Sequence, residues 1–282
     1  MRKVDLHIHS KFSSDGELPP EKIADELKRL DYYAFSITDH DSMGAYPEIV
    51  KYAQKIGLEV VPGVEITTGY RGRETHLLGY FLSPQDGREV LSPIVKSRLE
   101  LTRKRIEKLQ KLGYDINFEE VMEKSTPAPP TAPIIIELLM ERHPEKFSGM
   151  QDPIREFYRA HFLPGGPAYV ERVYVPIEKM IEKLLEKGAV PVLAHPGAYT
   201  PIEEEDIAYL KKAGLQGIEV KNTYHNKAQE EFYGKMAEKY SLAPTCGTDF
   251  HGKRKPSVHL GDVFCGYEVV EELKSRRNRN GI

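Results

Sequence analysis

Nine side chains of the kinds that bind divalent metal ions lie at or near the ends of short apolar runs in this 282-residue chain. They are histidines, aspartates and one glutamate. Neutral imidazole and carboxylate groups are nitrogen and oxygen donors that suit borderline and hard divalent cations. The sequence therefore predicts a metal centre whose ligands are His7, His9, Asp15, His40, Glu65, His76, His195, Asp249 and His251.

The first donors share one predicted strand. Within DLHIHS, the residues Asp5, His7 and His9 are spaced two apart, and side chains at that spacing point to the same face of a strand. The two imidazoles therefore converge, either as hydrogen-bonded neighbours or on a single ion. A buried histidine or carboxylate without a partner is costly, so the convergence of the whole set favours a bound cation.

The number of donors indicates more than one ion. Nine donors exceed the roughly four to six that one zinc, iron or manganese ion accepts. With one bridging carboxylate they supply roughly three protein bonds to each of three ions. Glu65 is the best bridge because it is the only glutamate in the set. No cysteine belongs to the set, so manganese, iron and zinc all fit it.

These donors need a scaffold of alternating strands and helices. Strand-like runs alternate with helix-like stretches near 20–30 and 46–56, in βαβα order. Continuous apolar runs suit parallel strands covered on both faces, and closure into a barrel would remove exposed edges. We expect an α/β fold, a distorted TIM-like (βα)7 barrel with the donors at its rim. Its seven predicted strands span 3–9, 33–38, 59–66, 75–81, 189–194, 217–220 and 242–247.

The alternation stops between residues 92 and 175. Leu99, Ile106 and Leu109 recur there at helical spacing. We therefore expect a barrel of residues 1–91 and 176–282, with a helical insertion of residues 92–175 as a cap over its mouth. Basic residues on the first insertion helix are interleaved with acids, which predicts a solvated face; they are Arg98, Arg103, Lys104, Arg105, Lys108 and Lys111.

Composition excludes several classes of partner. The formal net charge of −3 provides no general attraction to nucleic acid. The chain starts without a signal-like segment, and no apolar stretch is long enough to cross a bilayer, so we expect a cytoplasmic enzyme with no membrane association. No obligate protein partner is evident. Cys246 and Cys265 are too few for a disulfide framework, and we interpret them as buried apolar thiols.

Five segments resemble the motifs of the PHP (polymerase and histidinol phosphatase) family of metal-dependent phosphoesterases. They are DLHIHS, TDHD, the GVE of VPGVEIT, AHPG and GTDFHG, and together they span nearly the whole chain. The resemblance implies a distorted barrel and three divalent ions, Mn²⁺ first, with Fe²⁺ or Zn²⁺ as alternatives. The implied ligands are His7, His9, Glu65 and Asp249 for the first ion, Glu65, His76 and His195 for the second, and Asp15, His40 and His251 for the third.

Within the family, GGPAYV and GIEVKNTYHN resemble the branch that dephosphorylates nucleoside 3',5'-bisphosphates or degrades short RNA from its 5' end. The resemblance implies a nucleotide or short RNA as substrate, with Arg172 and His225 as phosphate contacts. One segment departs from the branch. Ala132, Pro133 and Ile134 stand where an arginine and a histidine usually flank the proline, which leaves the preferred phosphate ester open.

The predicted chemistry follows from the ions. A hydroxide bridging two metals would attack phosphorus, because metal coordination lowers the pKa of bound water to roughly 7. With Glu65 as the bridge, Asp41 and His225 are the candidate catalytic side chains for protonating the leaving alkoxide. Alternatively, Asp41 orients His40 and His225 is a solvent-facing loop residue.

Three alternatives remain at this point. One is a histidinol-phosphate phosphatase or another small-molecule phosphomonoesterase of the same family. Another is an amidohydrolase, which the presence of Glu65 disfavours because such enzymes commonly bridge their metals with a modified lysine. The third is a noncatalytic PHP-like binding module, which would be expected to have lost ligands. The native metal, the general acid and the oligomeric state are not predicted.

Overall fold

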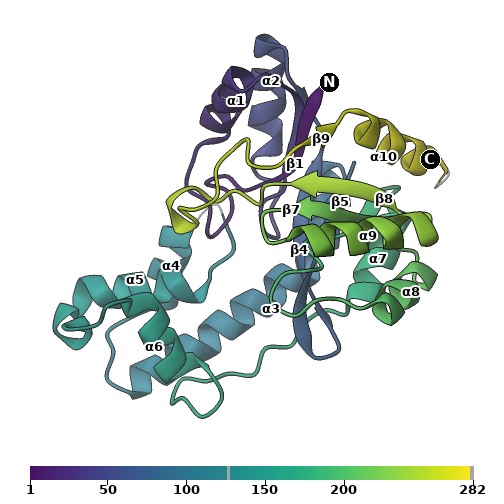
Figure 1. Cartoon of the computed structure of the whole chain (residues 1–282). Coiled ribbons are helices and arrows are strands. Elements are labelled where there is room, and N and C mark those ends of the chain that lie inside the picture. The colour runs from purple at the N-terminus through teal and green to yellow at the C-terminus, as the bar shows by residue number, and fades with distance from the viewer. Residues whose placement is uncertain (126–127, 280–282) are drawn as a thin grey trace. The chain divides into compact units, whose positions relative to one another are not determined.

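A computed structural model describes residues 1–125 and 128–279 of the chain (Figure 1). Within these residues the chain divides into two compact units. The first comprises residues 1–92 and 175–282, and the second comprises residues 93–174. Helix α3 (Pro84–Lys111) begins in the first unit and continues into the second. That residues 92–175 act as a cap stays a prediction.

The first unit contains a four-stranded sheet in the order β3-β2-β1-β9. Strand β1 pairs in parallel with β2 and antiparallel with β9, and β2 pairs in parallel with β3. Helices α1 and α2 pack on β2 and β3, with Ile23, Leu27 and Ile49 buried against them. The elements are β1 (Lys3–Ile8), β2 (Tyr32–Ile37), β3 (Glu59–Val60), β9 (Cys265–Gly266), α1 (Pro20–Arg29) and α2 (Tyr46–Ile56).

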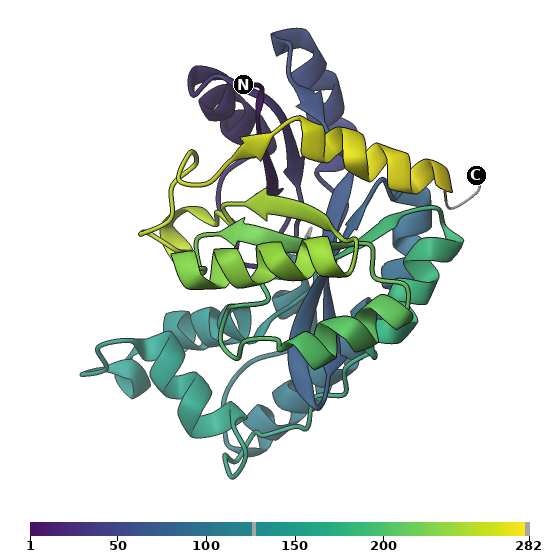
Figure 2. The same ribbon diagram turned by 45° about the vertical axis from the view of Figure 1, so that its right-hand side comes forward.

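The same unit contains a five-stranded sheet in the order β4-β5-β6-β7-β8. Figure 2 shows helix α9 lying along this sheet, where it contacts β7 and β8, and α10 also contacts β8. The strands are β4 (Gly63–Tyr70), β5 (Arg73–Tyr80), β6 (Val190–Leu193), β7 (Gly217–Asn222) and β8 (Ala243–Gly247). The helices are α7 (Ile177–Glu186), α8 (Glu204–Lys212), α9 (Lys227–Lys239) and α10 (Glu268–Arg279), and one 3-10 turn is η2 (Gly252–Arg254).

The fold is mixed α/β, and the predicted closed barrel of parallel strands is not confirmed. Strands β4, β5 and β6 pair antiparallel. Between β4 and β5 the cause is a two-residue turn, Arg71 and Gly72, with φ values of 49° and 74°, whereas β6 follows β5 only after the second unit. Positive φ at both turn residues is the backbone of a tight hairpin. Isolated bridges between Ile8 and Phe250, and between His40 and Glu65, link the two sheets.

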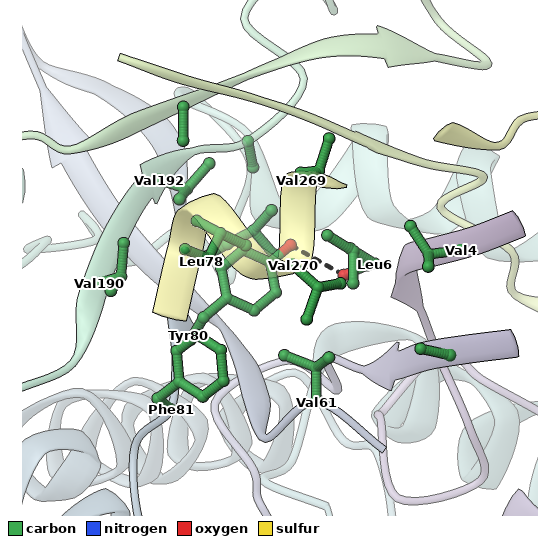
Figure 3. Close-up of a cluster of buried hydrophobic side chains, with 14 residues drawn as sticks. Val4, Leu6, Val61, Leu78, Tyr80, Phe81, Val190, Val192, Val269 and Val270 are labelled. Carbon is green, nitrogen blue, oxygen red and sulfur yellow. Dashed lines mark hydrogen bonds between the residues drawn. The ribbon is translucent and has the colours of Figure 1, made fainter. Parts of the chain in front are cut away.

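A buried apolar cluster fills the space between the two sheets. Strands β1, β5 and β6 each contribute residues that are fully buried, among them Leu6, Leu78 and Val192 (Figure 3). The hydroxyl of Tyr80 donates to the carbonyl oxygen of Leu6 at 2.8 Å, which satisfies the polar end of a buried aromatic side chain. This contact fixes the distance between β5 and β1, the strands that carry several of the predicted ligands.

The second unit is helical and has its own apolar core around Ile106, Leu109 and Phe157. The predicted solvated helix face is wrong at two positions, because Arg98 and Arg105 on α3 are only 9% and 8% exposed. The guanidinium of Arg105 lies over the rings of Tyr158 and Phe162 of this unit. The remaining elements are α4 (Phe118–Ser125), α5 (Ala132–Arg142), η1 (Pro144–Phe147) and α6 (Pro153–Phe162).

The two cysteines are not free thiols. Cys246 in β8 and Cys265 in β9 form a disulfide, with Cα atoms 6.0 Å apart. The prediction failed because a sequence separation of 19 does not reveal that the two strands, one from each sheet, lie side by side at the cysteines. Among the described helices, none combines the length and apolarity that a membrane span requires.

Candidate metal centre

Strand ends from both sheets bring four buried donors together. The Nε2 atoms of His7 and His9 lie 3.2 and 3.0 Å from Glu65 Oε2, and 3.3 and 3.0 Å from Asp249 Oδ1. His7 and His9 come from β1, Glu65 from β4, and Asp249 from the loop after β8. All four donor atoms lie within 4.8 Å of one another, a spacing that one ion can bridge.

Glycine 247 allows β8 to approach β1 at this point. A Cβ atom at Gly247 would lie 2.2 Å from the Cβ of His7 and 2.6 Å from its backbone nitrogen. Only glycine lacks that atom. Two residues later the chain turns at Asp249, whose φ of 54° is uncommon for a residue with a side chain. The turn points the Asp249 carboxylate toward His7 and His9.

A second group of donors lies around the other oxygen of Glu65. The Nδ1 of His76 and the Nε2 of His195 are each 2.9 Å from Glu65 Oε1. In the β4–β5 register Thr67 is opposite His76, so Glu65 and His76 are diagonal neighbours on one face of the sheet. The donors within 4.8 Å of one another here are His40, Glu65 and His76. His195 Nε2 lies 3.4 Å from His76 Nδ1.

A third group surrounds Asp15 in the loop after β1. The Nε2 atoms of His40 and His251 lie 3.5 and 3.4 Å from Asp15 Oδ2. His9 joins this group, and its ring stacks on that of His251 at 3.9 Å. His40 also has its Nδ1 atom 3.1 Å from Glu65 Oε2. Each of three residues therefore belongs to two groups: Glu65 to the first and second, His9 to the first and third, and His40 to the second and third. All nine predicted ligands lie in one cluster.

The unpaired atoms in this cluster fit metal ligands. Six donor atoms are buried without a hydrogen-bond partner among the described residues. An unpaired polar group in the interior is costly, and a cation removes that cost because it takes the lone pairs directly. Nitrogen and carboxylate oxygen donors suit manganese, iron or zinc. The six atoms are Nε2 of His7, His9 and His251, Nδ1 of His40, Oε2 of Glu65 and Oδ1 of Asp249.

The electrostatics of the cluster keep its carboxylates ionised. Burial alone would raise the pKa of Glu65, but His40, His76 and His7 outweigh burial and hold that pKa well below its usual value. Burial likewise opposes ionisation of Asp249, yet His7 and its neighbours hold the pKa of Asp249 well below normal. Both carboxylates therefore carry the negative charge that a divalent cation requires.

Sequence reasoning missed Glu219, a fully buried carboxylate in β7. Its two oxygens lie 3.2 and 3.3 Å from His7 Nδ1, and Oε2 accepts a hydrogen bond of 2.7 Å from the backbone nitrogen of His195. A carboxylate on the far nitrogen of a ligand histidine fixes its ring and raises its basicity. One signal was present, since an acid stands inside the apolar run GIEV.

Lys255 and Tyr224 are also neighbours of the cluster that the sequence did not indicate. Lys255 Nζ donates to Asp249 Oδ2 at 2.7 Å and lies 4.9 Å from the centre of the Tyr224 ring. Burial alone would lower the pKa of Lys255, but Asp249 and Tyr224 raise it. A permanent positive charge thus neutralises the oxygen of Asp249 that points away from His7 and His9.

Two further aspartates support the ligand loops. Asp5 accepts hydrogen bonds from the backbone nitrogens of His7 and Thr248, each at 3.1 Å, and from the Thr248 hydroxyl at 2.7 Å. Asp39 accepts from the Ser10 nitrogen at 2.6 Å and the Ser10 hydroxyl at 2.8 Å. Burial raises the pKa of each aspartate to about 7. They tie the β1 end to the loops that carry Asp249 and His40.

The predicted catalytic and phosphate-binding residues outside the cluster have other contacts. His225 uses both ring nitrogens on the backbone: Nδ1 donates to Val220 O at 2.8 Å, and Nε2 accepts from Gly197 N at 3.0 Å. This geometry does not support His225 as a proton donor or phosphate contact. Asp41 Oδ1 accepts from Thr67 N at 2.7 Å. Arg172 lies in the second unit, 4.6 Å from the Tyr174 ring, and its role stays a prediction.

Comparison with known proteins shows which families the chain is similar to. The family model described as the PHP domain matches residues 5–129, which include His7, Glu65 and His76. The chain is thus similar to the PHP domain over less than half of its length, and to enzymes that act on phosphate esters over most of its length. The number and identity of its metal ions are not fixed by this match.

Three curated relatives align with this chain over most of its length. The 3',5'-nucleoside bisphosphate phosphatase of Chromobacterium violaceum is 28% identical over 93% of this chain and 91% of its own. The phosphoribosyl 1,2-cyclic phosphate 1,2-diphosphodiesterase of Eggerthella lenta is 27% identical over 91% of this chain and 97% of its own. The 5'-3' exoribonuclease of Haemophilus influenzae is 25% identical over 89% and 90%.

A solved structure has the same fold. The crystal structure from Bifidobacterium adolescentis, described as a metal-dependent phosphoesterase, superposes with a TM-score of 0.81 over 97% of this chain and 96% of its own, at 23% identity. At that identity the likeness establishes the shared fold alone.

Proposed function

We propose that this chain is a metal-dependent phosphoesterase that acts on nucleotides, releasing the 3'-phosphate of nucleoside 3',5'-bisphosphates or shortening RNA in the 5'-to-3' direction. The observation that supports the reaction type is the cluster around Glu65, in which six buried donor atoms lack a hydrogen-bond partner among the described residues. The choice of substrate rests on the relatives, since the bisphosphate phosphatase aligns over 93% of the chain.

Three divalent ions, Mn²⁺ first, are the proposed cofactors. Bound ions lower the pKa of coordinated water to roughly 7 and neutralise charge on phosphoryl oxygens. We assign the ligands as the family resemblance implies, with His9 added to the third set because its donor atom lies within 4.8 Å of those of Asp15, His40 and His251. The first set is His7, His9, Glu65 and Asp249, the second is Glu65, His76 and His195, and the third is His9, Asp15, His40 and His251.

The side chains of the protein then have separable tasks. Glu65 faces the first set with one oxygen and the second set with the other, so it fixes the distance between them. Glu219 orients the His7 ring, and Lys255 donates to Asp249 Oδ2, the oxygen that points away from His7 and His9. Preorganised donors of this kind need no rearrangement as charge develops in the transition state.

A second candidate function is hydrolysis of a cyclic phosphodiester. The cyclic phosphate diphosphodiesterase of Eggerthella lenta is 27% identical over 91% of the chain, almost the identity of the bisphosphate phosphatase. Both substrates place a phosphate on a ribose hydroxyl, so the cluster serves either one. The difference between them lies in the rest of the molecule, because phosphoribosyl 1,2-cyclic phosphate carries no nucleobase.

Steady-state kinetics with manganese-loaded enzyme separates these possibilities. The substrates are adenosine 3',5'-bisphosphate, adenosine 5'-monophosphate, a short 5'-phosphorylated RNA, phosphoribosyl 1,2-cyclic phosphate and histidinol phosphate. We expect the highest kcat/KM for the bisphosphate or the RNA. A preference for the cyclic phosphate would support the second candidate, whereas a preference for histidinol phosphate would reject the nucleotide proposal. Enzyme treated with a chelator is the control for each substrate.

A further inference from the structure

A pocket of about 690 Å³ adjoins the second ligand set, and every residue that lines it belongs to the first unit. His76 and His195 line one end of it. Its walls are the β4–β5 hairpin, residues 70–76, and the loop after β6, residues 194–203, together with Asp206 of α8. The volume lies within the range of small-molecule sites, which is roughly 300–1,000 Å³. A phosphate ester held beside His76 and His195 can therefore extend into it.

The charged side chains that line the pocket do not favour a second anion, because the two arginines, Arg71 and Arg73, are matched by three acids, Glu74, Glu203 and Asp206. Arg71 pairs with Asp206 at 2.7 Å, and the Tyr70 hydroxyl donates to the same oxygen at 2.9 Å. Glu74 lies 3.1 Å from His76 Nε2, and Glu203 adds another carboxylate to the lining. Carboxylates at these positions repel phosphate, but they accept hydrogen bonds from the amino groups of a heterocycle.

Tyr199 provides an exposed aromatic face in this lining. Its side chain is 85% exposed, although its backbone has a φ of 53°, in the left-handed region that residues with a side chain seldom adopt. Strained backbone of this kind concentrates at ligand sites. The Tyr199 ring lies 5.7 Å from that of Tyr224, which lies 5.6 Å from the His195 ring. A row of rings thus leads from the ligand cluster to the pocket.

We propose that this pocket binds the nucleobase of the substrate, with Tyr199 as the stacking platform, while the phosphate to be hydrolysed lies beside His76 and His195. The inference rests on the proposed function for the identity of the ester. Stacking on an aromatic side chain is tolerant of base identity, because every base has a flat face. The pocket therefore makes the enzyme select nucleotides over phosphates of simple sugars without selecting one base.

Binding of adenosine tests the pocket separately from catalysis, because adenosine carries no phosphate. Saturation-transfer NMR and calorimetry would compare adenosine with ribose on the wild type, Tyr199→Ala, Tyr199→Phe and Tyr33→Ala. We expect adenosine to bind, ribose not to bind, and Tyr199→Ala to weaken adenosine binding roughly tenfold. Tyr199→Phe keeps the ring and should bind normally. Tyr33→Ala removes a partly exposed tyrosine that does not line the pocket, so it should change nothing.

The outcomes distinguish this inference from the proposed function. Equal adenosine binding by the wild type and Tyr199→Ala, or none by either, would overturn the base pocket even if phosphate esters are hydrolysed. Adenosine binding that depends on Tyr199, in a protein that hydrolyses no nucleotide, would retain the pocket and reject the proposed function. With both correct, Tyr199→Ala lowers kcat/KM for adenosine 3',5'-bisphosphate by roughly tenfold, and Tyr33→Ala leaves it unchanged. Thermal unfolding checks that the variant is folded.

Discussion

The two oxygens of Glu65 face environments that differ in burial. On the Oε2 side, the side chains of His7 and His9 are fully buried and Asp249 is 3% exposed, whereas His40, which also contacts Oε2, is 11% exposed. On the Oε1 side, His76 is 15% exposed and His195 is 8% exposed, and both line the pocket. We call these the closed side and the open side of the cluster.

The difference lies in what supports each side. The closed side is held by charged and hydrogen-bonding neighbours, since Glu219 contacts His7, Lys255 contacts Asp249 and Asp5 binds the backbone of His7. The open side has fewer such supports and borders the pocket. Rigid ligands favour tight metal binding, whereas access favours contact with the substrate. We infer that the closed side retains its ion and the open side meets the phosphate ester.

The substitution Glu65→Gln should have the largest effect, because it affects both sides. Glutamine keeps the shape but removes the charge that balances His7, His40 and His76. We expect kcat to fall about a thousandfold or more, together with a lower content of bound metal. Steady-state kinetics and elemental analysis measure the two effects. Near-normal turnover by a fully folded Glu65→Gln enzyme would contradict the central place of Glu65, and Glu205→Gln, an exposed glutamate outside the pocket, is the matched control.

The substitution Glu219→Gln should affect the closed side selectively. It weakens the contact with His7 Nδ1 while the amide oxygen can still accept from the backbone nitrogen of His195. We expect metal affinity to fall roughly ten- to a hundredfold, as for other groups that orient a ligand histidine. Competition with a fluorescent chelator measures it. Excess Mn²⁺ should restore most of the activity, and failure of that rescue would place Glu219 in the chemistry instead of in ligand positioning.

The substitution Lys255→Met should have a smaller effect. The methionine retains the apolar stem but removes the charge beside Asp249 Oδ2, and the Lys255 side chain is 26% exposed, so water replaces part of the lost contact. We expect metal affinity to fall roughly tenfold, with partial recovery in Lys255→Arg. An unchanged affinity combined with a raised KM would instead show that Lys255 contacts the substrate.

The ligands could be predicted from the sequence far better than their supports. The spacing of His7 and His9 within one predicted strand indicates them as ligands, and His195 and Asp249 are indicated because each follows an apolar run. Glu219 carries a weaker signal because it lies 212 residues from His7, and only the pairing of β7 with β8, which contacts β1, brings it near. Lys255 lies in a surface-like basic segment, GKRKP, that gives no indication of its contact with Asp249.

The fold was predicted in its elements but not in their pairing. Apolar periodicity located β1, β2 and the helices α1 and α2 because each buries one continuous stripe. Strand direction depends on turns, and the positive φ values at Arg71 and Gly72 reverse the chain where the sequence suggested a longer connection. Burial of Arg98 and Arg105 also depends on what packs against α3, which interleaved charges along the helix cannot show.

Removing the disulfide should have the smallest effect on catalysis. Cys246 lies in β8, three residues before Asp249, so the bond to Cys265 secures the closed side and ties one sheet to the other. The two cysteines are separated by 19 positions in the sequence, and for a loop of about this size the loss is typically about 2–4 kcal/mol of unfolding free energy. The double substitution Cys246→Ser and Cys265→Ser should lower stability to chemical denaturation by that amount and leave kcat within about twofold. Thiol titration of the native protein is the control. The expected kcat is nearly unchanged because the ligand positions depend on hydrogen bonds such as those of Asp5. Two reactive thiols in the native protein would contradict the disulfide. A stability that does not change on reduction would show that the two sheets hold together without the bond.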